Sequence, residues 1–188
     1  TIAAFDTGVS NFSEDVHYDL LGCLQKSIRG SDPDAAVFYL AKILASGDLL
    51  SACRRLLVIA SEDIGLAYPQ AAAITRACCE SAKELGMPEA QLTLANAAVM
   101  LATAPKSNSG HDAIAAATAC LESGKGQNVP SHMRPSNRFD GYKYPHDYPN
   151  HYVKQQYLPD DIKNEAFYTY GDNKTEQAAK AYWDNIKK

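Results

Sequence analysis

The sequence has no run of 18 apolar residues, no secretory signal peptide and no Cys-x-x-Cys pair. The first two absences leave no sign of a membrane span or of export, so we expect a cytoplasmic protein with no membrane partner. The third leaves the five cysteines, an odd number, as buried reduced thiols of a cytosolic chain. Through residue 124 the sequence also lacks the alternation of apolar and polar residues that is typical of strands.

The chain also has little net charge. A formal charge of −4 over 188 residues argues against a general nucleic-acid or membrane binder. The charge is uneven, because residues 1–104 hold seven Lys and Arg against 12 Asp and Glu, whereas residues 105–188 hold 11 against 10. The basic residues of the second half are interleaved with acids, which is typical of a solvated surface.

Before residue 125, apolar residues recur at helical spacing in six stretches. The second stretch begins after Ser31 or Asp32 as N-cap, because Pro33 needs no N–H partner in a first turn. Short loops between the stretches favour antiparallel neighbours. We therefore predict an all-α fold, with an antiparallel helical bundle over residues 16–124. The expected helices cover about 14–28, 33–46, 49–64, 69–86, 89–104 and 110–122.

The amino-acid composition changes after residue 124. Residues 125–173 contain five prolines and seven of the eleven tyrosines. Proline at this density excludes long helices, and tyrosine rings bury large areas, so we expect an irregular wrap packed on the bundle. A final helix is expected within residues 174–188. Residues 1–15 would be a linker or the remnant of an upstream element, and since Thr1 is not an initiator methionine, we expect a piece of a longer chain.

No catalytic motif stands out. Gly-Lys-Gly at 124–126 lacks the spacing of a phosphate-binding loop and follows no strand, so a helix C-cap explains it. His146, Asp147 and His151 would suggest metal ligands, but ring nitrogens bonded to tyrosine hydroxyls or to the backbone account for them more simply. We therefore predict no catalytic, cofactor-binding or metal-binding residue in this chain.

Cations and aromatic rings interleave over residues 134–157. This pattern suits single-stranded nucleic acid, whose bases stack on rings, and it equally suits cation–π packing within the wrap. Lys106 precedes a helix, where an ammonium and backbone N–H groups would hold a phosphate or a carboxylate, unless Ser107 or Asn108 simply caps that helix. The candidate nucleic-acid or partner contacts are Lys106, Arg134, Arg138, Lys143, Tyr144, His146, Lys154 and Tyr157.

Glu62 and Asp63 close the third expected helix, at the end where the helix dipole disfavours negative charge. An acidic pair there gains from a cation, which Arg54, Arg55 or Arg76 could supply from a neighbouring helix or subunit. Simple solvation of both carboxylates is the alternative. We predict that Arg54, Arg55, Glu62 and Asp63 make inter-helix or inter-subunit polar contacts.

Several short sequence motifs at the helix-loop junctions have an unusually specific order of residues. They are HYDL at 17–20, KSIRGSDPDAA at 26–36, RRL at 54–56, SEDIGLAYPQA at 61–71, GMPEA at 86–90, LATAPKSN at 101–108, and the Tyr-, His- and Gln-rich stretch at 141–159. In this order they resemble the C-terminal part of the replication-associated recombination protein family of AAA+ ATPases, the RarA/MgsA family, whose eukaryotic relative is the Werner-helicase-interacting protein. The resemblance covers about residues 16–160 and matches the final helix weakly.

This resemblance implies a place after the ATPase module and its helical lid, in a domain similar to the collar of clamp-loader subunits. It implies assembly into a homotetramer, action at stalled replication forks and single-strand gaps, and association with DNA, with single-stranded-DNA-binding protein and with the nucleoid. ATP and Mg²⁺ would be bound by the ATPase module of the parent protein. Since this sequence lacks that module, the resemblance assigns no cofactor to any residue here.

Three functions are therefore weighed for the chain. The first, which we favour, is an oligomerisation domain, because the fifth expected helix is apolar nearly all round and the sixth is alanine-rich. The second is a single-stranded nucleic-acid-binding module that uses residues 134–157. The third is a small helical enzyme with a metal at His146, Asp147 and His151.

Overall fold

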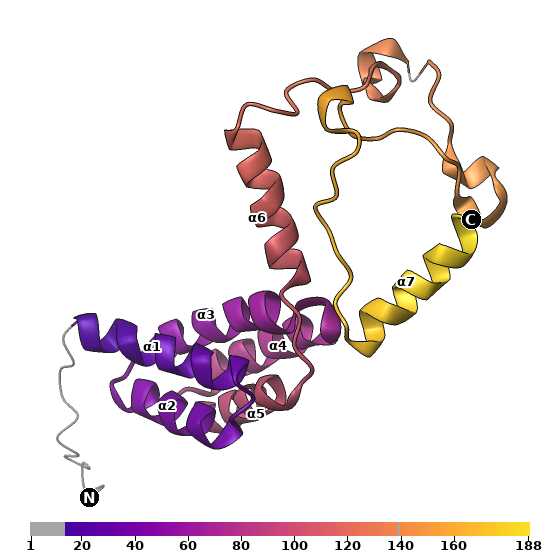
Figure 1. The fold of residues 1–188 in the computed structure, drawn as a ribbon. Helices are drawn as coiled ribbons and strands as arrows, with labels where there is room; N and C mark the ends of the chain where they lie inside the picture. The colour runs from indigo at the N-terminus through magenta and orange to yellow at the C-terminus, as the bar shows by residue number, and fades with distance from the viewer. Residues whose placement is uncertain (1–13, 139) are drawn as a thin grey trace, which may run out of the picture. The chain divides into compact units, whose positions relative to one another are not determined.

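The computed structural model describes residues 14–138 and 140–188, and over these residues the chain is helical without a strand (Figure 1). The predicted all-α class is confirmed. None of the described helices is long and apolar enough to cross a membrane. The linker expected at residues 1–15 falls, up to residue 13, outside the described residues. The α-helices are α1 (Glu14–Arg29), α2 (Pro33–Ala45), α3 (Leu49–Ile59), α4 (Gln70–Leu85), α5 (Ala90–Thr103), α6 (Ser109–Glu122) and α7 (Lys174–Ile186).

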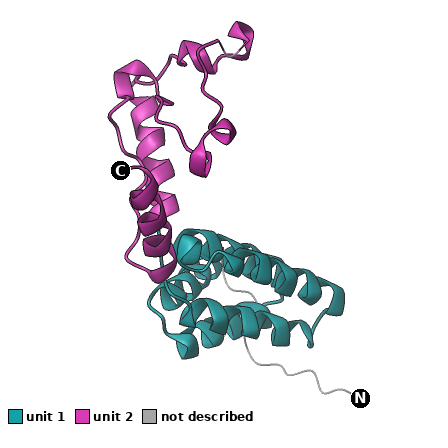
Figure 2. Ribbon diagram, turned by 90° about the vertical axis from the view of Figure 1, so that its right-hand side faces the viewer, with its two compact units in different colours: residues 1–108 teal, residues 109–188 magenta. Residues whose placement is uncertain are grey.

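The chain divides into two compact units, which are residues 1–108 with α1 to α5 and residues 109–188 with α6 and α7 (Figure 2). We expected the bundle to extend to residue 124, whereas the division falls directly before α6. The reason lies in the composition of α6, which offers only Ile114 and Leu121 as large apolar side chains. Neither of them joins the buried apolar cluster, all of whose members belong to unit 1.

Aspartate N-caps fix the starts of α2 and α3. The Asp32 carboxylate accepts a hydrogen bond from the Ala35 N–H at 2.9 Å, and the Asp48 carboxylate accepts one from the Ser51 N–H at 2.8 Å. Each bond satisfies an N–H that the first helical turn leaves without a partner. Both helices therefore begin where the sequence predicts.

The core of unit 1 is built around α5, which packs against α1, α2, α3 and α4. Its residues Leu94 and Leu101 lie seven positions apart and are fully buried, so they share the inward face. A helix that is apolar nearly all round is central in its bundle or lies in an interface, and within unit 1 α5 has the central position. Leu92 on the same helix is 63% exposed, so α5 also keeps an apolar residue at the surface.

The expected third helix changes its winding before it ends. α3 stops at Ile59, and the chain continues through a π-helical turn, Ala60–Ile64, and a 3-10 turn, Gly65–Ala67. A π-turn holds one residue more per hydrogen-bonded ring than an α-helix, and such turns often mark functional sites. Here the wider turn places Glu62 and Asp63 at the end of α3.

Unit 2 is built differently. Short 3-10 turns and extended stretches occupy the chain between α6 and α7 (Figure 1). Proline opens several of these turns, at Pro135, Pro145 and Pro149. The irregular character predicted for residues 125–173 is therefore observed, while its packing on the bundle stays a prediction.

Candidate functional site

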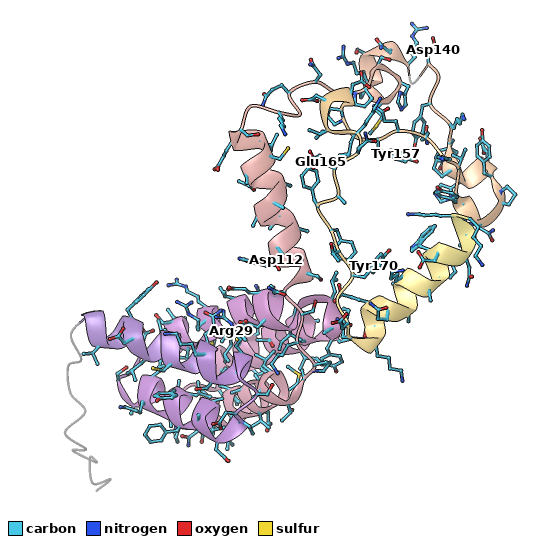
Figure 3. The ribbon with its side chains drawn as sticks, in the orientation of Figure 1. Arg29, Asp112, Asp140, Tyr157, Glu165 and Tyr170 are labelled. Carbon is cyan, nitrogen blue, oxygen red and sulfur yellow. The ribbon has the colours of Figure 1, made fainter. Side chains whose placement is uncertain are left out.

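A cluster of polar and charged side chains joins α1, α3 and the π-turn of unit 1. Gln25 and Arg29 lie one helical turn apart on α1, and Arg55 comes from α3. Glu62 and Asp63 come from the π-turn. Arg29 is the labelled member of this cluster among the helices of unit 1 (Figure 3).

Two donors from α1 hold the acidic pair. The Arg29 Nε–H donates to Asp63 Oδ1, and Arg29 Nη2 donates to Glu62 Oε1 at 3.4 Å. The Gln25 amide donates to Asp63 Oδ2 and to Glu62 Oε2, each at 3.0 Å. Arg55 Nη1 in turn donates to Gln25 Oε1 at 2.9 Å, so the Gln25 amide relays the contact between α3 and the acids.

Burial makes this network consequential. The Asp63 side chain is only 5% exposed, and a buried carboxylate is costly unless hydrogen bonds and an opposite charge accompany it. The hydrogen bond from Arg29 to Asp63, opposed by burial, raises the pKa of Arg29 above its ordinary value. Since the charges are paired within the cluster, it acts as a brace between helices and offers no group for proton transfer.

The partners of the acidic pair differ from those expected. Arg55 reaches the pair through Gln25, whereas the direct cation is Arg29, which the sequence did not single out. Arg76 instead pairs with Glu80 one turn along α4. The other candidate, Arg54, acts on Asp48: burial raises the pKa of this carboxyl, but hydrogen bonds from Ser51 and the charges of His17 and Arg54 outweigh it, so the pKa falls below its usual value.

Lys106 has a different environment from the one expected. Its ammonium donates to Ala102 O at 3.0 Å, to Ala104 O at 2.6 Å and to Ser31 Oγ at 2.9 Å. These bonds use all three N–H donors and satisfy carbonyls at the end of α5. Burial lowers the pKa of Lys106 below its ordinary value. An external phosphate or carboxylate would have to compete with these contacts.

The turn beside Lys106 is closely packed. The Ser107 N–H donates to Asp63 O at 2.9 Å, so the stretch after α5 lies against the π-turn. Gly65 has φ +47°, and a Cβ there would lie 2.8 Å from Ser107 O. A side chain at position 65 would therefore collide with a backbone oxygen that cannot move without breaking this contact.

The basic and aromatic segment 134–157 lies in unit 2. Its residues Lys154 and Tyr157 line one hollow of about 530 Å³, together with Lys163. Gln155 holds this stretch to the chain near Lys143, because its amide accepts from the Lys143 N–H at 3.1 Å and donates to Lys143 O at 2.7 Å. Tyr157 is labelled on this segment in Figure 3.

The other candidates of this segment are dispersed. Arg134 donates to Val129 O at 3.1 Å and lines a separate hollow of about 430 Å³ with Asp160 and Asp161, whose charges offset its own. Arg138 ends a 3-10 turn in the left-handed backbone region.

The rings of Tyr144 and His146 lie 5.1 Å apart, and those of His146 and His151 lie 4.9 Å apart. Their Nδ1 atoms are 3.2 Å from each other. Across residues 14–138 and 140–188, no three His, Cys, Asp or Glu side chains gather as a metal site would require.

Sequence reasoning missed a buried carboxylate in unit 2. Glu176, at the start of α7, accepts hydrogen bonds from Ser109 Oγ at 2.5 Å, from Tyr168 OH at 2.8 Å and from Asn173 Nδ2 at 2.5 Å. Its own N–H donates to Asn173 Oδ1 at 3.0 Å, which forms a reciprocal N-cap. The spacing of Asn173 and Glu176 carried the signal for this cap. Burial and the bond to Glu176 raise the pKa of Tyr168 to about 12.

Unit 2 also exposes apolar residues on α6. No residue of this helix is buried, and Ile114 and Leu121 are 65% and 56% exposed. They lie seven positions apart, so they share one face across two turns. Ala117 lies between them on that face and leaves it flat enough for another helix to approach.

Comparison with known proteins gives one family. Residues 30–187 match the family described as MgsA AAA+ ATPase C terminal. The chain is 47% identical over 183 residues to replication-associated recombination protein A of Bacillus subtilis, which covers 93% of this chain and 44% of that protein. It is 39% identical over 164 residues to the protein of the same name from Escherichia coli, covering 82% and 37%.

A eukaryotic relative matches the same region. ATPase WRNIP1 of Dictyostelium discoideum is 39% identical over 166 residues, which is 83% of this chain and 19% of that protein. The chain thus spans less than half the length of each of these relatives.

Proposed function

Because the chain belongs to the MgsA AAA+ ATPase C-terminal family, we propose that it is the part through which such an ATPase assembles with copies of itself, as a homotetramer. The relatives are named for replication-associated recombination, and the family is one of AAA+ ATPases. In this proposal ATP and Mg²⁺ are bound by another part of the parent protein, and this chain performs no catalysis. It acts by holding ATPase modules together near DNA, as a clamp-loader collar does.

The observation that carries the proposal is the exposed apolar face of α6. An alanine-rich helix that buries none of its residues lacks the packing from which protein helices gain most of their stability. Covering Ile114 and Leu121 with a second copy would contribute about 1.5–3 kcal/mol per side chain.

An obligate interface usually buries more than about 2,000 Å² in total, so α6 alone does not suffice. Other exposed apolar side chains of unit 2 would extend the covered surface. They include Val129, Tyr144, Tyr157 and Tyr182.

The test is the absolute mass of the chain by light scattering across a dilution series. We expect a mass near four times 20.4 kDa at high concentration. Ile114→Glu and Leu121→Glu should each lower it, because a charge on this face opposes burial. Ala116→Glu on the opposite side of α6 is the matched control and should leave the mass unchanged. A monomer at every concentration would refute self-association through this chain.

A second candidate function is binding of single-stranded nucleic acid by residues 134–157. It is favoured by the hollow that brings Lys154, Tyr157 and Lys163 together, which supplies cations beside a ring for stacking. Anisotropy of a labelled oligonucleotide, measured against salt concentration, tests it. Lys154→Ala should lower the salt slope by about one, and an unchanged slope would exclude this hollow. Binding of single-stranded-DNA-binding protein remains an expectation from the resemblance.

A further inference from the structure

Unit 2 contains a straight stretch of chain that neither proposed function uses. It runs from Glu165 to Gly171, between the last 3-10 turn and α7, without helix, turn or bend. Figure 3 labels Glu165 and Tyr170 on this stretch. Residues 167–170 read Phe-Tyr-Thr-Tyr, and aromatic and β-branched residues are enriched in β-strands. The 165–171 stretch therefore has the course and the composition of a strand.

The start of α7 holds the 165–171 stretch in place. The Tyr168 hydroxyl donates to Glu176 Oε1 at 2.8 Å, and the Gln177 amide donates to Gly171 O at 2.8 Å. The rings of Tyr168 and Tyr170 lie 4.9 Å apart in an edge-to-face contact, since side chains two positions apart share one face of an extended chain. The stretch is thus ordered before a partner binds, so pairing costs little further conformational entropy.

The main chain of this stretch has no hydrogen-bond partner among the described residues. From Ala166 to Tyr170, no main-chain N–H or carbonyl group bonds to any residue of 14–138 or 140–188. Such a row of groups is a template on which another extended segment adds as a strand. Proteins usually protect an exposed edge with lysine or proline, and residues 166–171 contain neither. The edge is therefore open to pairing.

A second copy of the same stretch is the partner that symmetry favours. In an antiparallel pair, opposite residues exchange hydrogen bonds in both directions, so two identical strands pair about a two-fold axis. A two-fold contact through α6 closes at two copies, and a tetramer of dihedral symmetry requires a second, different two-fold contact. The α6 face is also too small for an obligate interface by itself.

The 165–171 stretch is joined to the start of α6 within unit 2. Ser109 Oγ, on the first residue of α6, donates to Glu176 Oε1 at 2.5 Å, and the Tyr168 hydroxyl donates to the same oxygen. One carboxylate thus ties the stretch to the helix whose apolar face is exposed. The stretch extends the surface that α6 offers to another copy.

We propose that the 165–171 stretch pairs antiparallel with the same stretch of a second copy, as an intermolecular β-ribbon distinct from the α6 contact. This inference rests on the proposed self-association and names a second surface for it. A two-stranded ribbon needs support from a further element, which α7 supplies here. The Tyr168 hydroxyl keeps its bond to Glu176, because the pairing uses only main-chain groups.

The experiment combines infrared spectroscopy of the amide I band with light scattering of the whole chain across one dilution series. Residues 14–138 and 140–188 contain no strand, so we expect the β-structure component of the band to be weak in the monomer and to grow with the mass. A mass that rises without this component would overturn the proposal and leave self-association standing. A monomer at every concentration would refute both.

Two proline variants test the two edges of the stretch. Ala166 and Thr169 are exposed, and their N–H groups point to opposite edges because the positions differ by an odd number. Ala166→Pro and Thr169→Pro each remove one N–H, while proline keeps the preceding residue extended. One of the two should halve the tetramer mass and remove the β component. Thr169→Ala keeps the N–H and is the matched control. An unchanged mass for both proline variants would contradict the proposal.

A variant of α6 separates the two contacts. Ile114→Glu should halve the mass and retain the β component, because the ribbon does not use that face. If Ile114→Glu abolishes the β component and both proline variants leave it intact, the β structure does not come from this stretch, and the proposal fails.

A synthetic peptide with the sequence of residues 164–172 tests the partner. It should compete with the second copy and lower the mass toward half, whereas the same peptide with proline at positions 166 and 169 should not. If a scrambled peptide of the same composition competes equally well, the edge accepts any extended segment, and the proposed pairing with a second copy is wrong.

Discussion

The two units of this chain are stabilised by different interactions. Unit 1 buries a continuous apolar cluster drawn from all five of its helices, whereas the described residues of unit 2 bury only Ile162 and Glu176. Apolar burial is the dominant favourable contribution to folding, so unit 1 has the means to fold on its own. Unit 2 relies more on hydrogen bonds and ring contacts, such as those of Glu176 and Tyr168.

The difference begins in the sequences of the helices. In unit 1, α5 places Leu94 and Leu101 on one inward face, with alanines that let its neighbours approach. In unit 2, α6 carries as many alanines, but none of them is buried. Alanine favours a helix by itself, and the comparison shows that its small side chain adds close packing only where a partner lies against it.

The largest predicted effect is on the buried core of unit 1, which unit 2 lacks among its described residues. Leu94→Ala removes a fully buried side chain, and we expect it to lower the free energy of unfolding of unit 1 by about 2–5 kcal/mol. Urea unfolding followed by far-ultraviolet circular dichroism measures it. Leu92→Ala on the same helix is the matched control and should change little, because this side chain is mostly exposed. Equal losses for both variants would contradict the assigned core.

The next effect tests whether hydrogen bonds replace a core in unit 2. Glu176→Ala leaves donors of Ser109, Tyr168 and Asn173 without their acceptor, and should destabilise unit 2 by about 1–3 kcal/mol. Trp183, the single tryptophan, lies in α7 and reports on unit 2 by fluorescence. Glu165→Ala, an exposed carboxylate, serves as the control. If Trp183 fluorescence gives the same urea midpoint for unit 2 in both variants, Glu176 does not stabilise the unit.

A smaller effect appears at alkaline pH. The pKa of Tyr168 is raised to about 12 in the folded chain from about 10, so between these values the unfolded chain binds fewer protons. The contribution of Tyr168 to the stability of unit 2 is therefore present below pH 10 and is lost as the pH rises toward 12. The pKa of Lys106 is lowered in the folded chain. Its contribution to the stability of unit 1 therefore increases as the pH rises toward the ordinary pKa of lysine.

The measurement for this prediction is the free energy of unfolding from Trp183 fluorescence at a series of pH values. Tyr168→Phe should flatten the fall that the parent chain shows above pH 10. An equal fall in both proteins would assign the pH dependence to another group.

The smallest expected effect is the same in both units. Arg76 and Glu80 in unit 1, and Lys180 and Asp184 in unit 2, form ion pairs one turn apart on exposed helix faces. Solvent and salt screen such pairs. Arg76→Ala and Lys180→Ala should leave both thermal midpoints within error. A clear shift for Lys180→Ala alone would mean that unit 2 draws stability even from its surface charges.

The sequence was sufficient for the parts of the fold that local chemistry decides. Asp32 caps α2 as its position predicts, and α3 begins at the expected residue, Leu49. The π-turn after Ile59 could not be read in this way, because its winding is set together with contacts to α1 and to Ser107. The boundary between the two units, directly before α6, could not be predicted either, because helical spacing does not indicate which neighbour a helix packs against.

The candidate site shows the same limit. The need of Glu62 and Asp63 for a cation could be predicted from their place at a helix end. Its identity could not, because Arg29 lies 34 residues before Asp63 in the sequence and is brought there only by the packing of α1 on α3. Gln25 was not predicted either, because a neutral amide has no charge that would mark it as a partner of the acidic pair.

Two glycines of unit 1 would behave differently in a library of all single substitutions. Position 65 has a positive φ and faces the Ser107 oxygen, so selection for folding alone should return only glycine there. Position 22 has room for a Cβ, so the same selection should drift toward alanine. The survivors would thus distinguish a glycine that the fold requires from one that it only tolerates.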